Sequence, residues 1–128
     1  MKDKVICADT GMFLIRLALG LVFAVHGWGK LQDMPGTIGF FASLGLPAAC
    51  AYLVAWVEFV GGVAMIAGLW TKWAGILLAI TMAVATYYMR GRGFPGGYEF
   101  PLSLFLISLG VAFAGPGSFT IHKLFGGK

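Results

Sequence analysis

The sequence predicts an all-α fold, an integral membrane bundle of four transmembrane helices, from its composition, its size and the spacing of its charges. Of the 128 residues, 59% are hydrophobic and only 11% are charged, whereas a soluble domain has about 25% charged residues. A chain this small has too much surface for its volume to hide so many apolar side chains from water. Long uncharged stretches separate the charged residues, as expected for helices that each cross a membrane with roughly 17 to 25 residues.

Four spans are expected, and with their connections they form one domain over residues 1–128. A helix satisfies its own backbone hydrogen bonds in lipid, so each span should be helical. The first span resembles a cleavable signal peptide, but Arg16 interrupts it and Ala24-Val25-His26 lacks the small residues of a cleavage site. We therefore expect this span to be retained. The predicted spans cover residues 11–29, 49–70, 72–90 and 99–115.

The connections between the spans differ in length. Thr71-Lys72 is a very tight turn, so the second and third helices should be antiparallel neighbours. Residues 31–47 form the longest connection, and we expect them to lie at the membrane interface, either as a short helix or as a re-entrant or surface-lying segment. The connection on the same side of the bundle, residues 90–99, contains five Gly or Pro residues, which is typical of an irregular loop.

Glu58 is the most informative residue, because it is the only charged side chain within residues 34–71. An ionisable group at this depth in lipid is costly, and it indicates either function or a structural ion pair. Glu58 falls within a stripe of small residues that includes Ala51, Ala55 and Gly62. Such stripes let membrane helices approach closely, so Glu58 should point at neighbouring helices and away from lipid.

Two pairings for Glu58 are open. In one, Arg16 and Glu58 form a buried salt bridge, and His26, Lys30 and Glu99 build a polar mouth near the outer edge. In the other, His26 pairs with Glu58, and Arg16 extends to the headgroups on the side of the termini. The predicted intramembrane polar site therefore draws on Glu58, Arg16, His26, Lys30 and Glu99.

This polar site has a structural and a functional interpretation. A buried ion pair can simply fix the register of the helices. A polar pocket can instead bind or relay a ligand, because an imidazole changes charge near physiological pH and a carboxyl group can hydrogen-bond to a quinone. Aromatic side chains can stack on a flat ring, or they can serve as interfacial anchors near the span ends. The aromatic candidates are Trp28, Trp56, Tyr87 and Tyr88.

Several other chemistries are not expected. The chain has no Cys-x-x-Cys motif, and His26 and His122 lie on opposite faces of the membrane, so we predict neither a metal site nor a haem. Cys7 and Cys50 should also be a bilayer apart, which is too far for a disulfide. No phosphate loop or Ser/His/Asp arrangement is present, and the net charge of +4 is interpreted as membrane anchoring rather than nucleic-acid binding.

The distribution of basic residues predicts the orientation. Five lysines fall on the side of the termini, against three basic residues on the other side, which predicts cytoplasmic termini in a bacterial inner membrane. The first group is Lys2, Lys4, Lys72, Lys123 and Lys128, and the second is Lys30, Arg90 and Arg92.

The ordered set of motifs resembles the DoxX family of small four-span bacterial membrane proteins, from about residue 12 to residue 118. No single motif identifies the family, but the order of all the motifs along the chain is more specific. After Gly-Pro-Gly many members carry a Ser-Leu-Asp-like ending, whereas this chain has Ser118-Phe-Thr-Ile121 without the Asp. The matching pieces are Arg16-x-x-x-Gly20, His26-Gly27-x-x-Lys30, Gly45-Leu46-Pro47, Glu58-x-x-Gly61-Gly62, Gly68-Leu69-x-Thr71, Glu99-Phe-Pro101-Leu102 and Gly115-Pro116-Gly117.

The resemblance implies a role in membrane redox chemistry. The family name belongs to a membrane subunit of a thiosulfate:quinone oxidoreductase, and relatives take part in redox-linked membrane complexes and in amine-dehydrogenase maturation. One hypothesis is therefore a quinone-associated subunit, with quinone as ligand and a partner protein supplying the electron-carrying cofactor. A second is a membrane scaffold that recruits partner proteins, and a third is a small transporter or proton pathway. Besides membrane lipid, we expect partner proteins or a homo-oligomer, because four short helices enclose little interior.

Overall fold

The computed structural model describes residues 2–125, and within them it is helical and contains no strand. Four helices in this range are long and apolar enough to cross a membrane, which confirms the predicted fold class. Met1 and residues 126–128, including the Lys128 of the charge balance, lie outside the described residues. The helices are α1 (Lys2–Gln32), α2 (Met34–Ser43), α3 (Ala48–Ala67), α4 (Thr71–Met89), α5 (Glu99–Ala114) and α6 (Ile121–Leu124).

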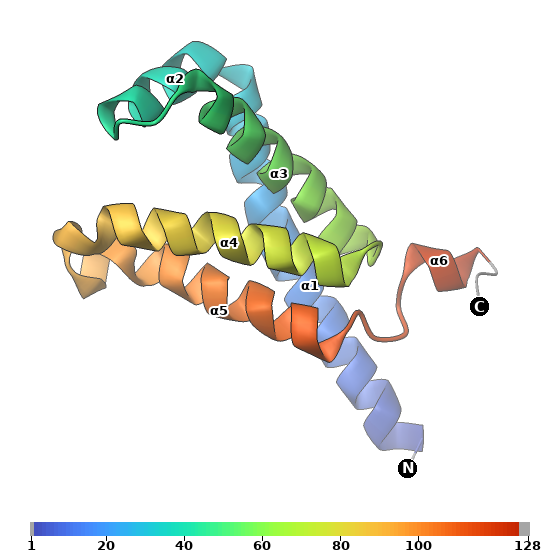
Figure 1. The fold of residues 1–128 in the computed structure, drawn as a ribbon. Coiled ribbons are helices and arrows are strands. Elements are labelled where there is room, and N and C mark those ends of the chain that lie inside the picture. The colour runs from blue at the N-terminus through green and yellow to red at the C-terminus, as the bar shows by residue number, and fades with distance from the viewer. Residues whose placement is uncertain (1, 126–128) are drawn as a thin grey trace.

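The four long helices form two antiparallel pairs, as Figure 1 shows. α1 packs along α3, and α4 packs along α5. The pairs meet where α3 turns into α4, and they diverge toward the other end, where α2 and the connection before α5 lie. The bundle is therefore closed at one end and spread apart at the other. Its buried core includes Leu19, Phe23, Met65, Leu78 and Val111.

Glycines bring α1 and α3 into backbone contact. A Cβ atom on Gly27 would overlap the backbone nitrogen of Phe59, and one on Gly20 would lie 2.6 Å from the backbone oxygen of Gly62. Such small residues let membrane helices pack with their backbones touching. Glu58 is buried on the same face of α3, so the predicted orientation of the small-residue stripe is confirmed.

The turn between α3 and α4 is short, but it lies before the predicted Thr71-Lys72, which form the start of α4. α3 ends at Gly68, whose φ of 74° is left-handed, a conformation that glycine adopts without steric cost. α4 begins at Thr71, so only residues 68–70 separate the two helices. α3 and α4 run in opposite directions and contact each other near this turn, but they diverge beyond it, so the prediction that they are antiparallel neighbours holds only at this end.

The long connection over residues 31–47 contains a helix. Of the two interpretations left open by the sequence, the structure selects the short helix, α2. Asp33 caps its N-terminus by accepting a hydrogen bond of 3.1 Å from the backbone nitrogen of Gly36, and Pro35 occupies the first turn, where proline is tolerated. α1 is also longer than its predicted span, because it continues as a helix from Lys2 to Gln32.

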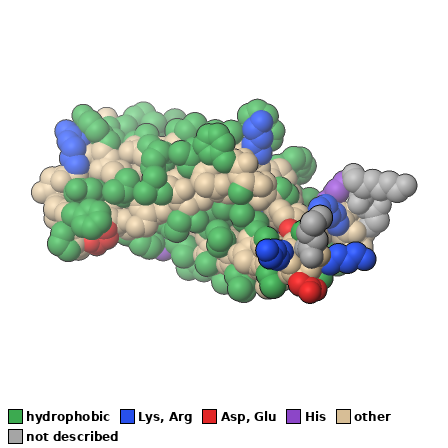
Figure 2. Space-filling view, turned by 90° about the horizontal axis from the view of Figure 1, so that it is seen from below, with side chains coloured by type: hydrophobic (Ala, Val, Ile, Leu, Met, Phe, Trp, Pro, Cys, Tyr) green, Lys and Arg blue, Asp and Glu red, His purple; other side chains and the backbone are tan. Residues whose placement is uncertain are grey.

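Charged side chains gather toward the two ends of the molecule, and hydrophobic side chains cover the surface between them, as Figure 2 shows for one face. The two chain ends lie at the same end of the bundle in Figure 1, where the Ser118 hydroxyl donates to the Asp9 carboxylate at 2.5 Å. Cys7 and Cys50 are both free thiols. Which side of the membrane the termini face stays a prediction.

Candidate intramembrane polar site

Glu58 forms an ion pair with Lys30. The Lys30 Nζ atom donates to Glu58 Oε2 at 2.8 Å, and the carboxylate side chain is only 4% exposed, against 26% for Lys30. Both pairings considered from the sequence, with Arg16 and with His26, are therefore wrong. The physical reason is the close approach of the helices at Gly27, which brings Lys30, one turn further along α1, beside Glu58 on α3.

Arg16 lies at the closed end of the bundle, where it binds backbone oxygens. Its guanidinium donates to the carbonyl groups of Met65 and Ile66, each at 3.0 Å, at the end of α3. It also donates to the carbonyl groups of Pro116 and Phe119, each at 2.7 Å, in the segment after α5. The last carbonyl groups of a helix lack helical partners and carry partial negative charge. Arg16, which is completely buried, therefore holds the end of α3 against the segment that follows α5.

His26 and Glu99 are both near the open end, and neither contacts Glu58. The His26 Nδ1 atom is 2.7 Å from the carbonyl oxygen of Val22, so Nδ1 carries the proton and Nε2 is a free acceptor in the neutral ring. The imidazole packs against the Phe100 ring with centroids 5.7 Å apart. Glu99 accepts a hydrogen bond of 2.6 Å from the backbone nitrogen of Gly96, which closes the turn before α5.

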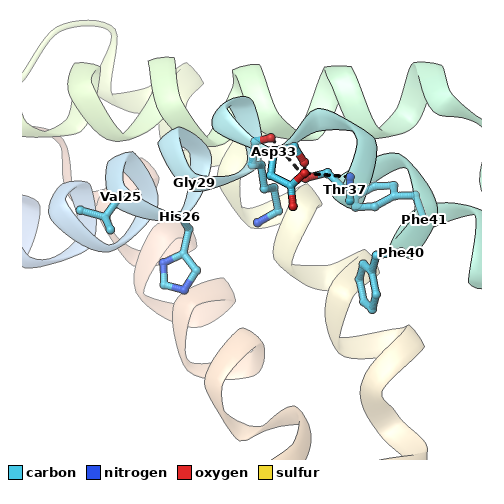
Figure 3. Close-up of a pocket in the computed structure, with 9 residues that line it drawn as sticks. Val25, His26, Gly29, Asp33, Thr37, Phe40 and Phe41 are labelled. Carbon is cyan, nitrogen blue, oxygen red and sulfur yellow. Dashed lines mark hydrogen bonds between the residues drawn. The ribbon is translucent and has the colours of Figure 1, made fainter.

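An open cavity of about 510 Å³ adjoins the ion pair. Figure 3 shows its lining, which comes from the end of α1 and from α2, with α4 and α5 beneath. His26 projects from α1 into this space, and Phe40 projects from α2. Lys30 also lines the cavity, and its side chain is 26% exposed, so this side chain connects the buried Glu58 carboxylate with the open space. The polar lining residues are His26, Lys30, Asp33 and Thr37.

The sequence interpretation missed the contribution of α2. Asp33, Thr37, Phe40 and Phe41 line the cavity, and the Thr37 hydroxyl donates to the backbone oxygens of Lys30 (3.2 Å) and Asp33 (2.9 Å). These four residues have the spacing of one helix face. That periodicity was the available signal, but the short helix was only one of the interpretations considered for residues 31–47, and its residues were not included in the predicted site.

The four aromatic residues considered for ring stacking lie elsewhere. Trp28 and Trp56 both contact Phe59, with ring centroids 5.6 and 6.4 Å apart, and both are half exposed. Tyr87 and Tyr88 pack edge to face on each other. None of the four lines the cavity beside Lys30, so a stacking role for them stays a prediction.

Fold and site together define the class: a four-span helical membrane protein with an ion pair held between two helices and open to a cavity at one end. The family model of DoxX matches residues 11–91. The chain therefore belongs to the DoxX family, as the motifs indicated.

Curated relatives resemble the chain over most of its length. It is 41% identical over 109 residues to "Putative oxidoreductase CatD" of Bacillus subtilis (strain 168), which covers 84% of this chain and 81% of that protein. It is 26% identical over 125 residues to "Inner membrane protein YqjF" of Escherichia coli (strain K12), covering 94% and 95% of the two chains. An "Uncharacterized protein" of Haemophilus influenzae is 31% identical over 119 residues, with 87% of each chain covered. No solved structure matches the chain.

Proposed function

We propose that this DoxX-family protein is a quinone-associated subunit of a membrane redox complex, and that the quinone ring binds in the cavity beside Lys30. One observation carries the proposal: Lys30, whose ammonium group is held by a buried carboxylate at 2.8 Å, has a partly exposed side chain and lines a cavity. The oxidoreductase name of the Bacillus subtilis relative supports a redox role.

The cavity offers both a donor and an acceptor. An ammonium group has three hydrogen-bond donors, and Glu58 is the one side-chain acceptor that Lys30 Nζ contacts among the described residues. Another of its N–H groups can therefore donate to a quinone carbonyl. The Nδ1 atom of His26 donates to the Val22 carbonyl oxygen. The other ring nitrogen, Nε2, can therefore accept a hydrogen bond from the hydroxyl group of the quinol. The site thus suits both oxidation states of the ligand.

The ion pair has separate roles for its two members. Lys30 contacts the ligand, and Glu58 positions Lys30 and balances its charge in a region of low dielectric. Reduction of a quinone to a quinol consumes two electrons and two protons. In this proposal a redox cofactor of a partner protein supplies the two electrons, water at the open cavity supplies the two protons, and this chain supplies the binding site.

The direct test is the binding of a quinone without an isoprenoid tail to the purified protein in nanodiscs, measured by calorimetry. A hydrogen bond to a charged group is worth about 1.5–3 kcal/mol, so Lys30→Met should weaken binding roughly 10- to 100-fold. Glu58→Gln should also weaken it, because Lys30 loses the group that holds it. Lys72→Met is the matched control, since Lys72 is exposed at the other end of the bundle. Equal affinity of the wild type and the Lys30 variant would contradict the proposal.

A further inference from the structure

A second, apolar groove runs between α1 and α5. Its volume is about 570 Å³, and every residue that lines it is either apolar or glycine. Leu104 forms part of its buried floor, whereas Ile15 and Ile107 on its two walls remain exposed. It therefore has the character of a channel for a hydrocarbon chain, in contrast to the polar cavity beside Lys30.

The groove and the polar cavity follow one another along α1. Val22 lines the groove, and His26, one helical turn further along α1, lines the polar cavity. On α5, Leu104 lies one turn after Phe100, whose ring packs against His26. The two spaces are therefore about one helical turn apart, and the contact between His26 and Phe100 lies between them.

We propose that this groove holds the isoprenoid tail of a membrane quinone whose ring occupies the polar cavity. This inference rests on the proposed function and specifies its substrate as a long-tailed lipid quinone. Along α1 the groove extends from Met12 to Val22, about 15 Å at 1.5 Å per residue. That length suits a chain of several isoprene units better than a compact ligand.

The charge of the polar cavity favours a quinone over a phospholipid. The Lys30 ammonium is already neutralised by Glu58 at 2.8 Å, and Asp33 adds a carboxylate to the lining. No surplus positive charge is therefore available from these groups for a phosphate. A quinone ring is neutral, so its carbonyl oxygens can accept hydrogen bonds from the remaining N–H groups of Lys30 without a positively charged site.

The groove is expected to orient the ligand more than to increase its affinity. A tail that leaves lipid for an apolar groove exchanges one hydrocarbon environment for another, so burial provides little driving force. The informative measurement is therefore where the tail lies. A long-tailed quinone that carries a photoreactive diazirine on its tail is the probe, with the full chain in phosphatidylcholine nanodiscs and mass spectrometry to locate the label.

We expect the label on residues of the groove, such as Ile15 and Ile107, and its loss when unlabelled long-tailed quinone is added. Gly110→Leu should remove most of this labelling while leaving the binding of tail-free quinone unchanged. A Cβ atom at Gly110 meets no atom within 4 Å, so the added side chain can enter the groove without displacing a helix. Gly39→Leu in α2 is the matched control, because it is equally open and lines neither space.

The outcomes separate this inference from the function on which it rests. If tail-free quinone binds but the label falls on the outer face of α3, around Leu53 and Val60, the inference is overturned and the proposed function stands. Equal labelling of the groove by a photoreactive phosphatidylcholine that excess quinone fails to displace would identify a lipid site and also overturn it. If tail-free quinone does not bind the wild-type protein, the proposed function fails, and the inference fails with it.

Discussion

Two cations on α1 are bound in contrasting ways at the two ends of the bundle. At the closed end, Arg16 is completely buried and donates four hydrogen bonds to backbone oxygens. At the open end, Lys30 is one quarter exposed and donates to a single carboxylate, that of Glu58. A cation whose donors are used by the protein stabilises the fold, whereas one that retains donors beside a cavity can bind a ligand.

The largest expected effect is at the closed end. Arg16→Met would remove one buried and three partly buried hydrogen bonds to backbone carbonyl groups, and we expect it to lower the free energy of unfolding by about 3 kcal/mol or more. Unfolding in sodium dodecyl sulfate measures this change. Arg90→Met is the control, because Arg90 is exposed and donates only to the Tyr87 carbonyl. Equal stability of the two variants would show that the closed end does not depend on Arg16.

A smaller effect is expected where α1 and α3 touch. Gly27→Ala would place a Cβ atom against the backbone of α3, which should force the helices apart and lower the free energy of unfolding by about 1–3 kcal/mol. The same titration measures it. Gly29→Ala, two residues further on the same helix, meets no atom within 4 Å and should leave stability nearly unchanged. A Gly27 variant as stable as the Gly29 variant would contradict the close packing of these helices.

The smallest effect on stability is expected from replacing both members of the ion pair at the open end. Lys30→Met combined with Glu58→Leu should keep the free energy of unfolding within about 1 kcal/mol of the wild type, because a buried ion pair contributes little over apolar side chains of similar size. Glu58→Leu alone should be less stable than the double variant, since it leaves Lys30 without its partner.

The same double variant separates the proposed function from a purely structural role. It should lose quinone binding while staying folded, which calorimetry in nanodiscs would measure. A loss of stability as large as that of Arg16→Met would instead show that the ion pair fixes the helix register, as a membrane scaffold requires.

Much of the fold was predictable because hydrocarbon imposes simple rules on a sequence. The uncharged stretches predicted the four long helices, and Gly68 and Thr71 mark the short turn between two of them. Helix ends outside the lipid were less predictable, since hydropathy carries no information about where a water-exposed helix stops. For that reason the predicted start of the first helix, residue 11, was wrong: α1 begins at Lys2.

The candidate site was only partly predictable. Glu58 stood out as an isolated charge, but its partner depended on how α1 lies against α3. The sequence interpretation assigned Lys30 to a polar mouth near the outer edge, and it did not include the reach of its long side chain. The role of Arg16 was hidden for a different reason: its partners are backbone carbonyl groups, and every residue of the chain has one.

The position of α2 has a consequence for how DoxX-family sites can diversify. All of the residues that line the polar cavity fall within one stretch of the chain, from Val25 to Phe41, whereas Glu58 is supplied by α3. The part of this stretch on α1 also holds α1 against α3, through Gly27 and Lys30, whereas Thr37 and Phe40 on α2 line the cavity without belonging to a long helix. Substitutions on α2 can therefore change the shape of the cavity while the sequences of the four long helices stay the same.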